Sequence, residues 1–165
     1  MTQQKKSDVD KPDYVLALEK AYGAPSQAGF GSAVFFAQVD ETGDLEELAK
    51  KYYQYFVGDK WEEWGEETWV APWKEVYARK TGTKHDILEE LTGIDDRDAA
   101  NSVTMILDVV EDAQAAQAAL AQSYDAPEVA DLRVYTIGDG EAMSGLVVAG
   151  RRENGEATCL VFLMD

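Results

Sequence analysis

The densest group of chemically active side chains lies in the segment WEEWGEETWVAPW, which spans residues 61–73. Its glutamates come in adjacent pairs between tryptophans. Carboxylates beside tryptophan occur in glycosidase clefts, whereas tryptophan is also typical of protein-interface hot spots. A third interpretation is a structured linker with its indoles in the core and its acids in solvent. The interface interpretation selects as partner-binding residues Trp61, Glu62, Glu63, Trp64, Glu66 and Glu67.

A second group of residues would line a small-molecule pocket or a hydrolase site. The loop 138–141, with the sequence GDGE, places two carboxylates between predicted strands. No Gly-Lys-Ser/Thr follows it, as a phosphate loop requires, and it lacks the alternating ligands of a calcium loop. A plain turn is the simpler interpretation. The alternative pocket would be lined by Trp69, Trp73, Tyr77 and Asp139.

The remaining reactive side chains point away from catalysis. His85 is the only histidine and stands between Lys84 and Asp86 at a polar helix start, which favours a surface or capping role. Cys159 is the only cysteine and lies in an apolar run, which predicts a buried, inert thiol. One histidine and one distant cysteine make no Cys/His metal site. We therefore expect no metal, no cofactor and no catalytic set, which favours a binding protein over an enzyme and leaves the question open.

The net charge of −17 restricts the partners. Phosphates of a nucleic acid would be repelled, and so would an anionic membrane surface. A basic protein partner, mimicry of nucleic acid, simple solubility and a salt-adapted proteome all remain open. Acids outnumber bases strongly in residues 40–67 and again in 86–112, so one broad negative surface is expected that would steer a basic partner.

The 165 residues fit one domain. Residues 1–11 are polar and predict a disordered tail, and 12–165 a single globular domain. The tail has no apolar core of a signal peptide, and no stretch is long and apolar enough to span a bilayer, so we expect a cytoplasmic protein of a bacterium or phage. Periodicity and breakers predict helices over 13–22, 44–57, 72–79, 84–91 and 95–122, and strands over 32–39 and 68–71.

Three further strands are predicted at the C-terminal end, over 132–137, 145–152 and 157–164. Asn154-Gly155 predicts a two-residue type I′ turn between the last two, with Arg152 opposite Ala157 and Val148 opposite Val161. The strands are apolar on both faces, and a sheet buried on both faces needs a layer on each side. The expected fold is an α/β (α+β) three-layer α/β/α sandwich with a C-terminal antiparallel three-stranded meander.

The segments LRVYTIG (132–138) and SGLVVAG (144–150) resemble the C-terminal part of the nuclease A inhibitor family. Those small acidic proteins carry a similar Val-Tyr-x-Ile-Gly strand, a short loop and a Gly-Leu strand. The resemblance implies an α/β/α sandwich and, for the class, nuclease inhibition. The N-terminal half lacks the family's opening motif around 22–36, so no inhibitory residue is carried over.

The leading hypothesis is a non-enzymatic acidic binding protein, of the inhibitor or immunity type, for a basic partner such as a nuclease or toxin. The alternatives are a small-molecule-binding domain or hydrolase that uses the Trp/carboxylate pocket, and a structural or adaptor domain without a discrete site.

Overall fold

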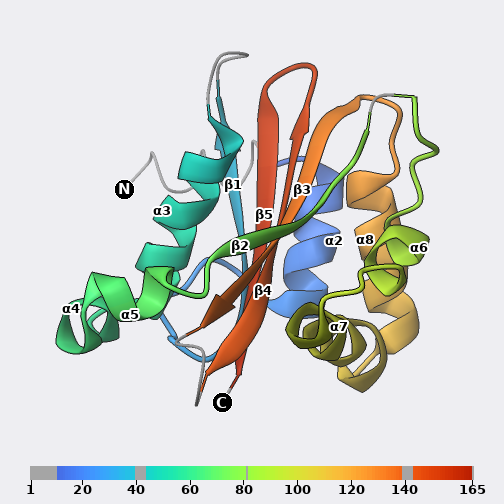
Figure 1. The fold of residues 1–165 in the computed structure, drawn as a ribbon. Helices are drawn as coiled ribbons and strands as arrows, with labels where there is room; N and C mark the ends of the chain where they lie inside the picture. Colours follow the sequence, from blue (N-terminus) through green and yellow to red (C-terminus); the bar gives the residue numbers. More distant parts are fainter. Residues whose placement is uncertain (1–10, 40–43, 81, 139–142, 165) are drawn as a thin grey trace.

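The fold is built on one antiparallel sheet of five strands. A computed structural model describes residues 11–39, 44–80, 82–138 and 143–164. The spatial order is β1-β5-β4-β3-β2, so the three C-terminal strands form the centre and two earlier strands form the edges (Figure 1). The strands are β1 (Gly31–Gln38), β2 (Lys74–Ala78), β3 (Val129–Gly138), β4 (Ser144–Arg152) and β5 (Glu156–Met164).

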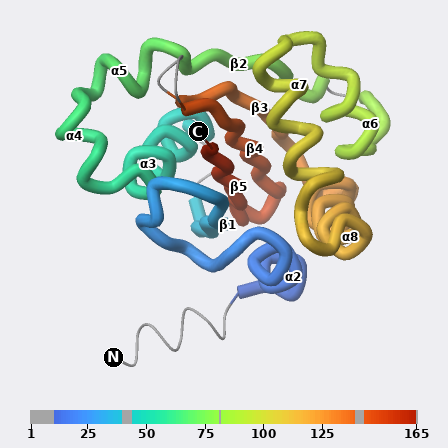
Figure 2. The backbone as a smooth tube through the Cα atoms, turned by 90° about the horizontal axis from the view of Figure 1, so that it is seen from below, coloured from blue at the N-terminus to red at the C-terminus, as the bar shows by residue number. Residues whose placement is uncertain are grey.

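Helices cover both faces of this sheet, as Figure 2 shows from below. One face packs against α3 (Leu45–Val57), α4 (Lys60–Trp64) and α5 (Glu66–Val70). The other packs against α2 (Asp13–Tyr22), α6 (Ile87–Thr92), α7 (Arg97–Thr104), the π-helical turn η1 (Met105–Val109) and α8 (Ala113–Tyr124). The predicted α+β architecture with a C-terminal meander is confirmed, and helices lie on each side of the sheet.

Side chains of the central strands alternate between two cores. Val134, Val148 and Leu160 point to the α2/α8 side, whereas Tyr135 and Val161 point to the α3 side. This is why these strands are apolar throughout rather than at every second position. The sheet is therefore an interior layer.

Several acids of this acidic chain serve as helix N-caps. The side chain of Asp44 accepts a hydrogen bond from the Glu46 amide at 2.9 Å, and Asp96 accepts one from the Ala99 amide at 3.0 Å. The first turns of α6 and α8 are capped in the same way by Asp86 and Asp112. A carboxylate at this position satisfies amides that have no partner within the helix. Part of the negative charge thus has a structural role.

The segment 68–79 has the opposite secondary structure to the one predicted. Residues 68–70 belong to the helix α5 rather than to a strand, and 74–78 form the edge strand β2 rather than a helix. Glu75 pairs with Tyr135 and Tyr77 with Val134, with a bulge between the two pairs. Pairing with β3 outweighs the local helix signal of Pro72.

The long helix predicted over 95–122 is broken. The α-helix α7 passes into η1, and Val110 is extended, with φ −58° and ψ 145°, before α8 begins. The backbone carbonyls released by this break find partners elsewhere. The Tyr22 hydroxyl donates to the Ile106 carbonyl at 2.7 Å, and the Gln117 amide donates to the Leu107 carbonyl at 3.0 Å.

The C-terminal hairpin is present with a different turn. Its loop holds three residues, 153–155, and only Gly155 has a positive φ (91°), so it is not a type I′ turn. The pairing moves by one residue: Ala157 lies opposite Arg151 and Val148 opposite Leu160. The predicted register was wrong, because a two-residue and a three-residue turn differ by one position in every pair.

Candidate protein-binding surface

Two single-turn helices, α4 and α5, carry the Trp/Glu segment. Gly58 ends α3, and Gly65 separates α4 from α5 with a φ of 92°, a conformation that favours glycine. The turn at Gly65 reverses the chain, so the two helices lie side by side at one edge of the molecule (Figure 1). The predicted glutamates and tryptophans therefore lie on two short helices. As the linker interpretation expected, the indoles of Trp61 and Trp69 are buried and the glutamates are exposed.

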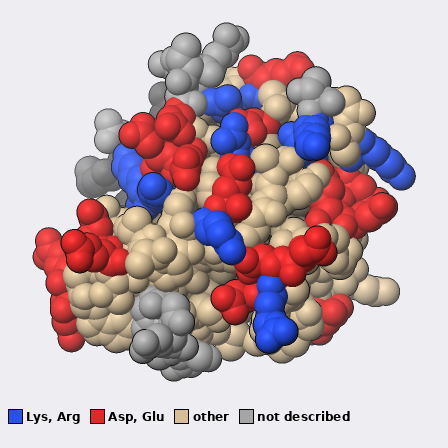
Figure 3. Space-filling model, in the orientation of Figure 1, with Lys and Arg blue, Asp and Glu red and all other residues tan. Residues whose placement is uncertain are grey.

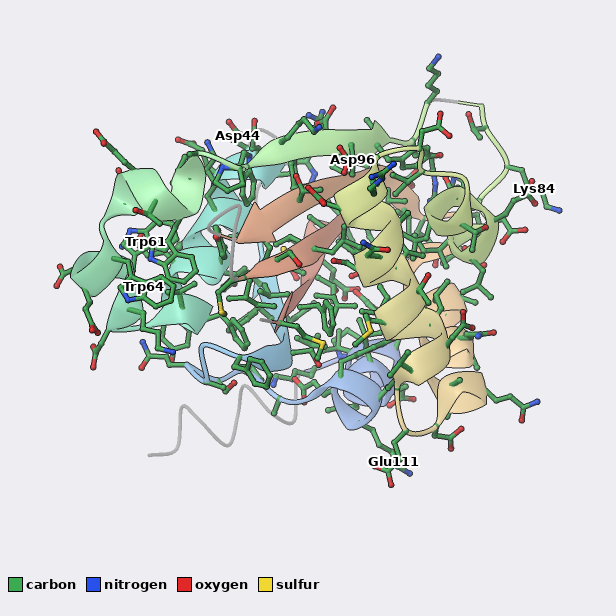
Figure 4. All side chains as sticks on the ribbon, turned by 60° about the horizontal axis from the view of Figure 1, so that its bottom comes forward. Asp44, Trp61, Trp64, Lys84, Asp96 and Glu111 are labelled. Atoms are coloured by element: carbon green, nitrogen blue, oxygen red, sulfur yellow. The ribbon has the colours of Figure 1, made fainter. Side chains whose placement is uncertain are left out.

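Three indoles of this segment stack. The ring of Trp69 lies parallel to that of Trp64, with centroids 5.0 Å apart, and nearly parallel to that of Trp61 at 6.3 Å. Trp69 is fully buried and Trp61 is 5 % exposed, but Trp64 is 39 % exposed. Figure 4 shows Trp61 and Trp64 together on the side away from α6 and α8. The stack reaches from the core to solvent, and its outer indole is available to a partner.

The stack is anchored to the sheet. The Trp69 indole N–H donates to the Lys60 carbonyl at 3.0 Å, and the Tyr53 hydroxyl lies 3.0 Å from the Trp69 carbonyl. The same hydroxyl accepts a hydrogen bond from the Gly138 amide at 3.0 Å, at the end of β3. Tyr53 also meets the rings of Trp61 and Trp69 edge-on. The exposed ring of Trp64 thus rests on a rigid base.

Four glutamates flank Trp64 in the sequence of α4 and α5. They are exposed, and Figure 3 shows acidic side chains gathered on the left, over α4 and α5. The ammonium group of Lys60 lies 5.7 Å from the centre of the Trp64 ring, within the range of a cation–π contact. A partner's cation would therefore have to displace the Lys60 ammonium from this ring. We call the following set the α4–α5 surface: Glu62, Glu63, Trp64, Glu66 and Glu67.

Trp61 belongs to the predicted set but not to this surface. Its buried ring supports Tyr53 and Trp69 from within the aromatic core. Its position three residues before Trp64 placed it in the same predicted set, but only one of the two indoles faces solvent. Both tryptophans were selected as members of the Trp/Glu segment, and composition does not distinguish a buried indole from an exposed one.

The residues of the alternative pocket are not brought together. Trp69 is enclosed in the stack, and Trp73 is half-buried, with its indole N–H donating to Glu46 at 2.8 Å and its ring stacked on Tyr135. Tyr77 packs on the opposite face of the sheet, and Asp139 lies outside the described residues. A cavity of about 500 Å³ touches Trp73, but its other lining residues include neither Trp69 nor Tyr77.

A buried ion pair on the other face was not foreseen from the sequence. The guanidinium of Arg79 donates to both carboxylate oxygens of Glu90, at 2.8 and 2.6 Å, and their side chains are 4 % and 8 % exposed. The Tyr77 hydroxyl donates to the same carboxylate at 2.5 Å, and Arg79 also reaches the Tyr124 carbonyl. Burial favours a raised pKa for Glu90, but the hydrogen bonds from Arg79 and Tyr77 outweigh it and hold the pKa below 4.5.

The other reactive side chains have structural positions. Cys159 is buried as predicted, and burial raises the pKa of its thiol to about 12. His85 is half-buried, with Nδ1 3.0 Å from the Ala126 carbonyl oxygen, so it bridges the start of α6 to the end of α8 rather than standing free. Within the described residues, no group of three His, Cys, Asp or Glu side chains is placed to hold a metal ion.

The helices of the two acid-rich runs pack on different faces of the sheet. Helices α3, α4 and α5 of the first run and helices α6 and α7 of the second lie on opposite faces of the sheet. The single broad negative surface expected from the sequence stays a prediction. Of the two, only the first run surrounds an exposed tryptophan.

Comparison with known proteins returned no match among family models, curated proteins or solved structures. Among the helices that the structure describes, none combines the length and the apolar composition that crossing a membrane requires. The function must therefore be argued from the surface itself.

Proposed function

We propose that this protein binds a basic protein partner through the α4–α5 surface and performs no chemistry on it. The observation that carries the proposal is the exposed Trp64 ring, fixed on a buried indole, with four exposed glutamates on the same two helices. Tryptophan is among the residues that contribute most to binding energy at interfaces, and a ring that is already ordered loses little entropy when it binds.

The charge defines the class of partner. Exposed carboxylates on the same two helices as the indole attract lysine and arginine side chains, raise the rate of encounter and disfavour acidic proteins. Arginine is the better match, because its planar guanidinium stacks on an indole and pairs with a carboxylate in two hydrogen bonds. The partner surface would present at least one arginine to Trp64, with further basic residues at the rim.

An inhibitor or immunity role in the cytoplasm, with a basic nuclease or toxin as the target, is the specific form of this proposal. Its motivation is the net charge of −17 and the resemblance at 132–138 and 144–150. The first segment lies in β3 and the second in β4, both within the sheet, which is the interior layer of the fold. They bear on the class of protein and contribute nothing to the binding surface.

Affinity capture with matched charge variants tests the proposal. The test variant carries Glu62→Gln, Glu63→Gln, Glu66→Gln and Glu67→Gln, and the control carries Glu89→Gln, Asp95→Asn, Glu128→Gln and Glu153→Gln, which remove the same charge from exposed sites elsewhere. We expect a basic protein to be retained at low salt by the wild type and the control, released at high salt, and lost from the test variant. Equal capture by both variants, or no partner at low salt, would contradict the proposal.

A further inference from the structure

A second candidate surface lies around the broken helix, on the opposite side of the sheet from the α4–α5 surface. A cavity of about 220 Å³ opens there between the start of β1, the end of β5 and η1. Its walls are apolar, and two of the residues that form them are strongly exposed: Phe30 is 49 % exposed and Val109 is 60 % exposed. We call it the η1 groove and define it by Phe30, Met105, Val109, Val110, Phe162 and Met164.

The break that exposes Val109 is held in place by other parts of the chain. Tyr22 of α2 and Gln117 of α8 donate hydrogen bonds to the carbonyls of Ile106 and Leu107. In a continuous α-helix these carbonyls would accept from the helix's own amides. Burial raises the pKa of the Tyr22 hydroxyl, which therefore keeps the proton that it donates over the whole ordinary pH range. π-helical turns of this kind cost stability and are frequent at functional sites. The exposed valine is thus a fixed feature of the fold.

The size of the groove selects a single side chain. Pockets for drug-sized ligands span roughly 300–1,000 Å³, and this one is smaller. Two methionines contribute to its walls, and their unbranched thioether side chains adapt to aromatic or aliphatic guests. One large apolar side chain of a partner fits these walls better than a free metabolite, for which the walls offer few polar groups.

The rim determines what accompanies that side chain. Asp108 precedes Val109, and Glu111 and Asp112 follow Val110, all three exposed. A neighbouring groove of about 450 Å³ between α2 and α8 shares Val110 with the first, and its charged lining residues are Lys20, Glu111 and Asp112. Figure 4 shows Glu111 at the edge of the molecule, far from Trp61 and Trp64. Basic residues beside the apolar guest would meet these acids.

We propose that the η1 groove is a second docking site, which takes one large apolar side chain from a partner segment that carries lysine or arginine on both sides of it. A second copy of this chain is disfavoured as the occupant, because each copy carries a charge of −17 and would place like charge against this rim. The site is independent of the α4–α5 surface. It gives the protein two separate contacts for basic polypeptides, on opposite faces of the sheet.

Methionine-methyl NMR with defined peptides tests this proposal. The probe is the pentapeptide Lys-Lys-Phe-Lys-Lys, and two controls replace its Phe by Ala or its four Lys by Glu. We expect the methyl signals of Met105 and Met164 to shift with the probe, while the buried Met143, on the other face of the sheet, does not. Loss of the apolar side chain should weaken binding about tenfold or more, and the acidic peptide should not bind.

Two protein variants separate the groove from general charge attraction. Val109→Ser removes an apolar wall of the groove at an exposed position and should weaken binding of the probe at least about fivefold. Leu16→Ser, at another exposed aliphatic residue, should leave binding of the probe unchanged. The four-glutamine variant of the α4–α5 surface should keep the full response of Met105, which distinguishes this site from the proposed function.

Three results would overturn the proposal. Equal shifts with the Phe and Ala peptides would show charge attraction alone, and an unchanged response in Val109→Ser would place the guest elsewhere. Shifts of Met105 and Met164 that grow with protein concentration in the absence of peptide, together with a dimer in sedimentation, would assign the groove to a second copy of the chain.

Discussion

The two faces of the sheet are closed in different ways. On the α2/α8 side the core is mainly aliphatic, and its charged groups, Arg79 and Glu90, are paired and buried. On the α3 side the core is aromatic, and a stack of indoles continues to the surface at Trp64. Acidic residues occur on both sides, so charge alone does not identify a binding surface. The difference lies in which apolar side chain stands beside the acids: a stacked indole on the α3 side, and the aliphatic Val109 on the α2/α8 side.

Breaking the buried ion pair should have the largest effect on stability. We expect Arg79→Met to lower the free energy of unfolding by about 3–5 kcal/mol, since it leaves the Glu90 carboxylate buried without its partner. The matched control is Arg133→Met. Arg133 pairs with Glu75, each of the two side chains is 40 % exposed, and the pair should contribute less than about 1 kcal/mol. Urea titrations of both variants measure this, and equal losses would contradict the account.

The Arg79–Glu90 ion pair also predicts how the stability of the protein changes with pH. The pKa of Glu90 is lowered in the folded protein, so its contribution is fully present above 4.5 and is lost as the pH falls below that value. The stability difference between the wild type and Arg79→Met should therefore narrow below about pH 4.5. A difference that stays constant down to pH 3 would show that Arg79 acts through packing alone.

Removing the middle indole should have the next largest effect. We expect Trp69→Ala to cost about 3 kcal/mol, the lower part of the range for a buried tryptophan, because the exposed ring of Trp64 can move into the space. Trp64→Ala should cost less than about 1 kcal/mol, because its ring is already partly solvated. If the two variants are equally destabilised by urea, Trp64 is a core residue and its role in binding is lost.

The hairpin turn should be sensitive at one position. Gly155→Ala should cost about 1–3 kcal/mol, because φ is 91° and a Cβ atom there would collide with the Val39 carbonyl. Asn154→Ala should cost less, since its φ is not positive. Thermal unfolding of the two variants compares them. Equal losses at both positions would indicate the type I′ turn instead.

Raising the pH should have no effect on stability near neutrality. At more alkaline pH it should destabilise the packing on both faces of the sheet together. Burial raises the pKa of Tyr14, on the α2 side, and of Tyr52, on the α3 side, to about 12. Their contribution is full below pH 10, the unfolded value, and is lost as the pH rises from 10 to 12. Absorbance at the phenolate band should show these groups titrating late and together with unfolding. If Tyr14 or Tyr52 titrates at pH 10 without unfolding, the face of the sheet that holds it is open to water.

The sequence was sufficient where local signals agree with the tertiary structure. Asp44 before a 3.6-residue apolar period correctly predicted the start of α3, and Gly58 predicted its end. The three C-terminal strands and the buried Cys159 were also correct. These elements carry their own caps, breakers and apolar patterns, so no distant partner is needed to define them.

The errors occur where a distant residue decides the local structure. Strand β2 depends on pairing with β3, and the helix break at Val110 depends on hydrogen bonds from Tyr22 and Gln117. The one-residue shift of the hairpin goes with a hydrogen bond from the Val39 amide to the Gly155 carbonyl, which no local pattern shows. For the binding surface, the segment was identified correctly as rich in tryptophan and acid, but only folding separates the exposed Trp64 from the buried Trp61.

Fluorine NMR of the protein labelled with 5-fluorotryptophan tests the central claim most directly, since the four tryptophans give four signals. Poly-arginine is the probe, and Trp73, which is half-buried and stacked on Tyr135, is the internal control. The account predicts that the Trp64 signal shifts first and furthest at low salt, that 0.5 M salt reverses the shift, and that Trp73 stays in place. A Trp64 signal that does not move, or one that moves no further than that of Trp73, would contradict it.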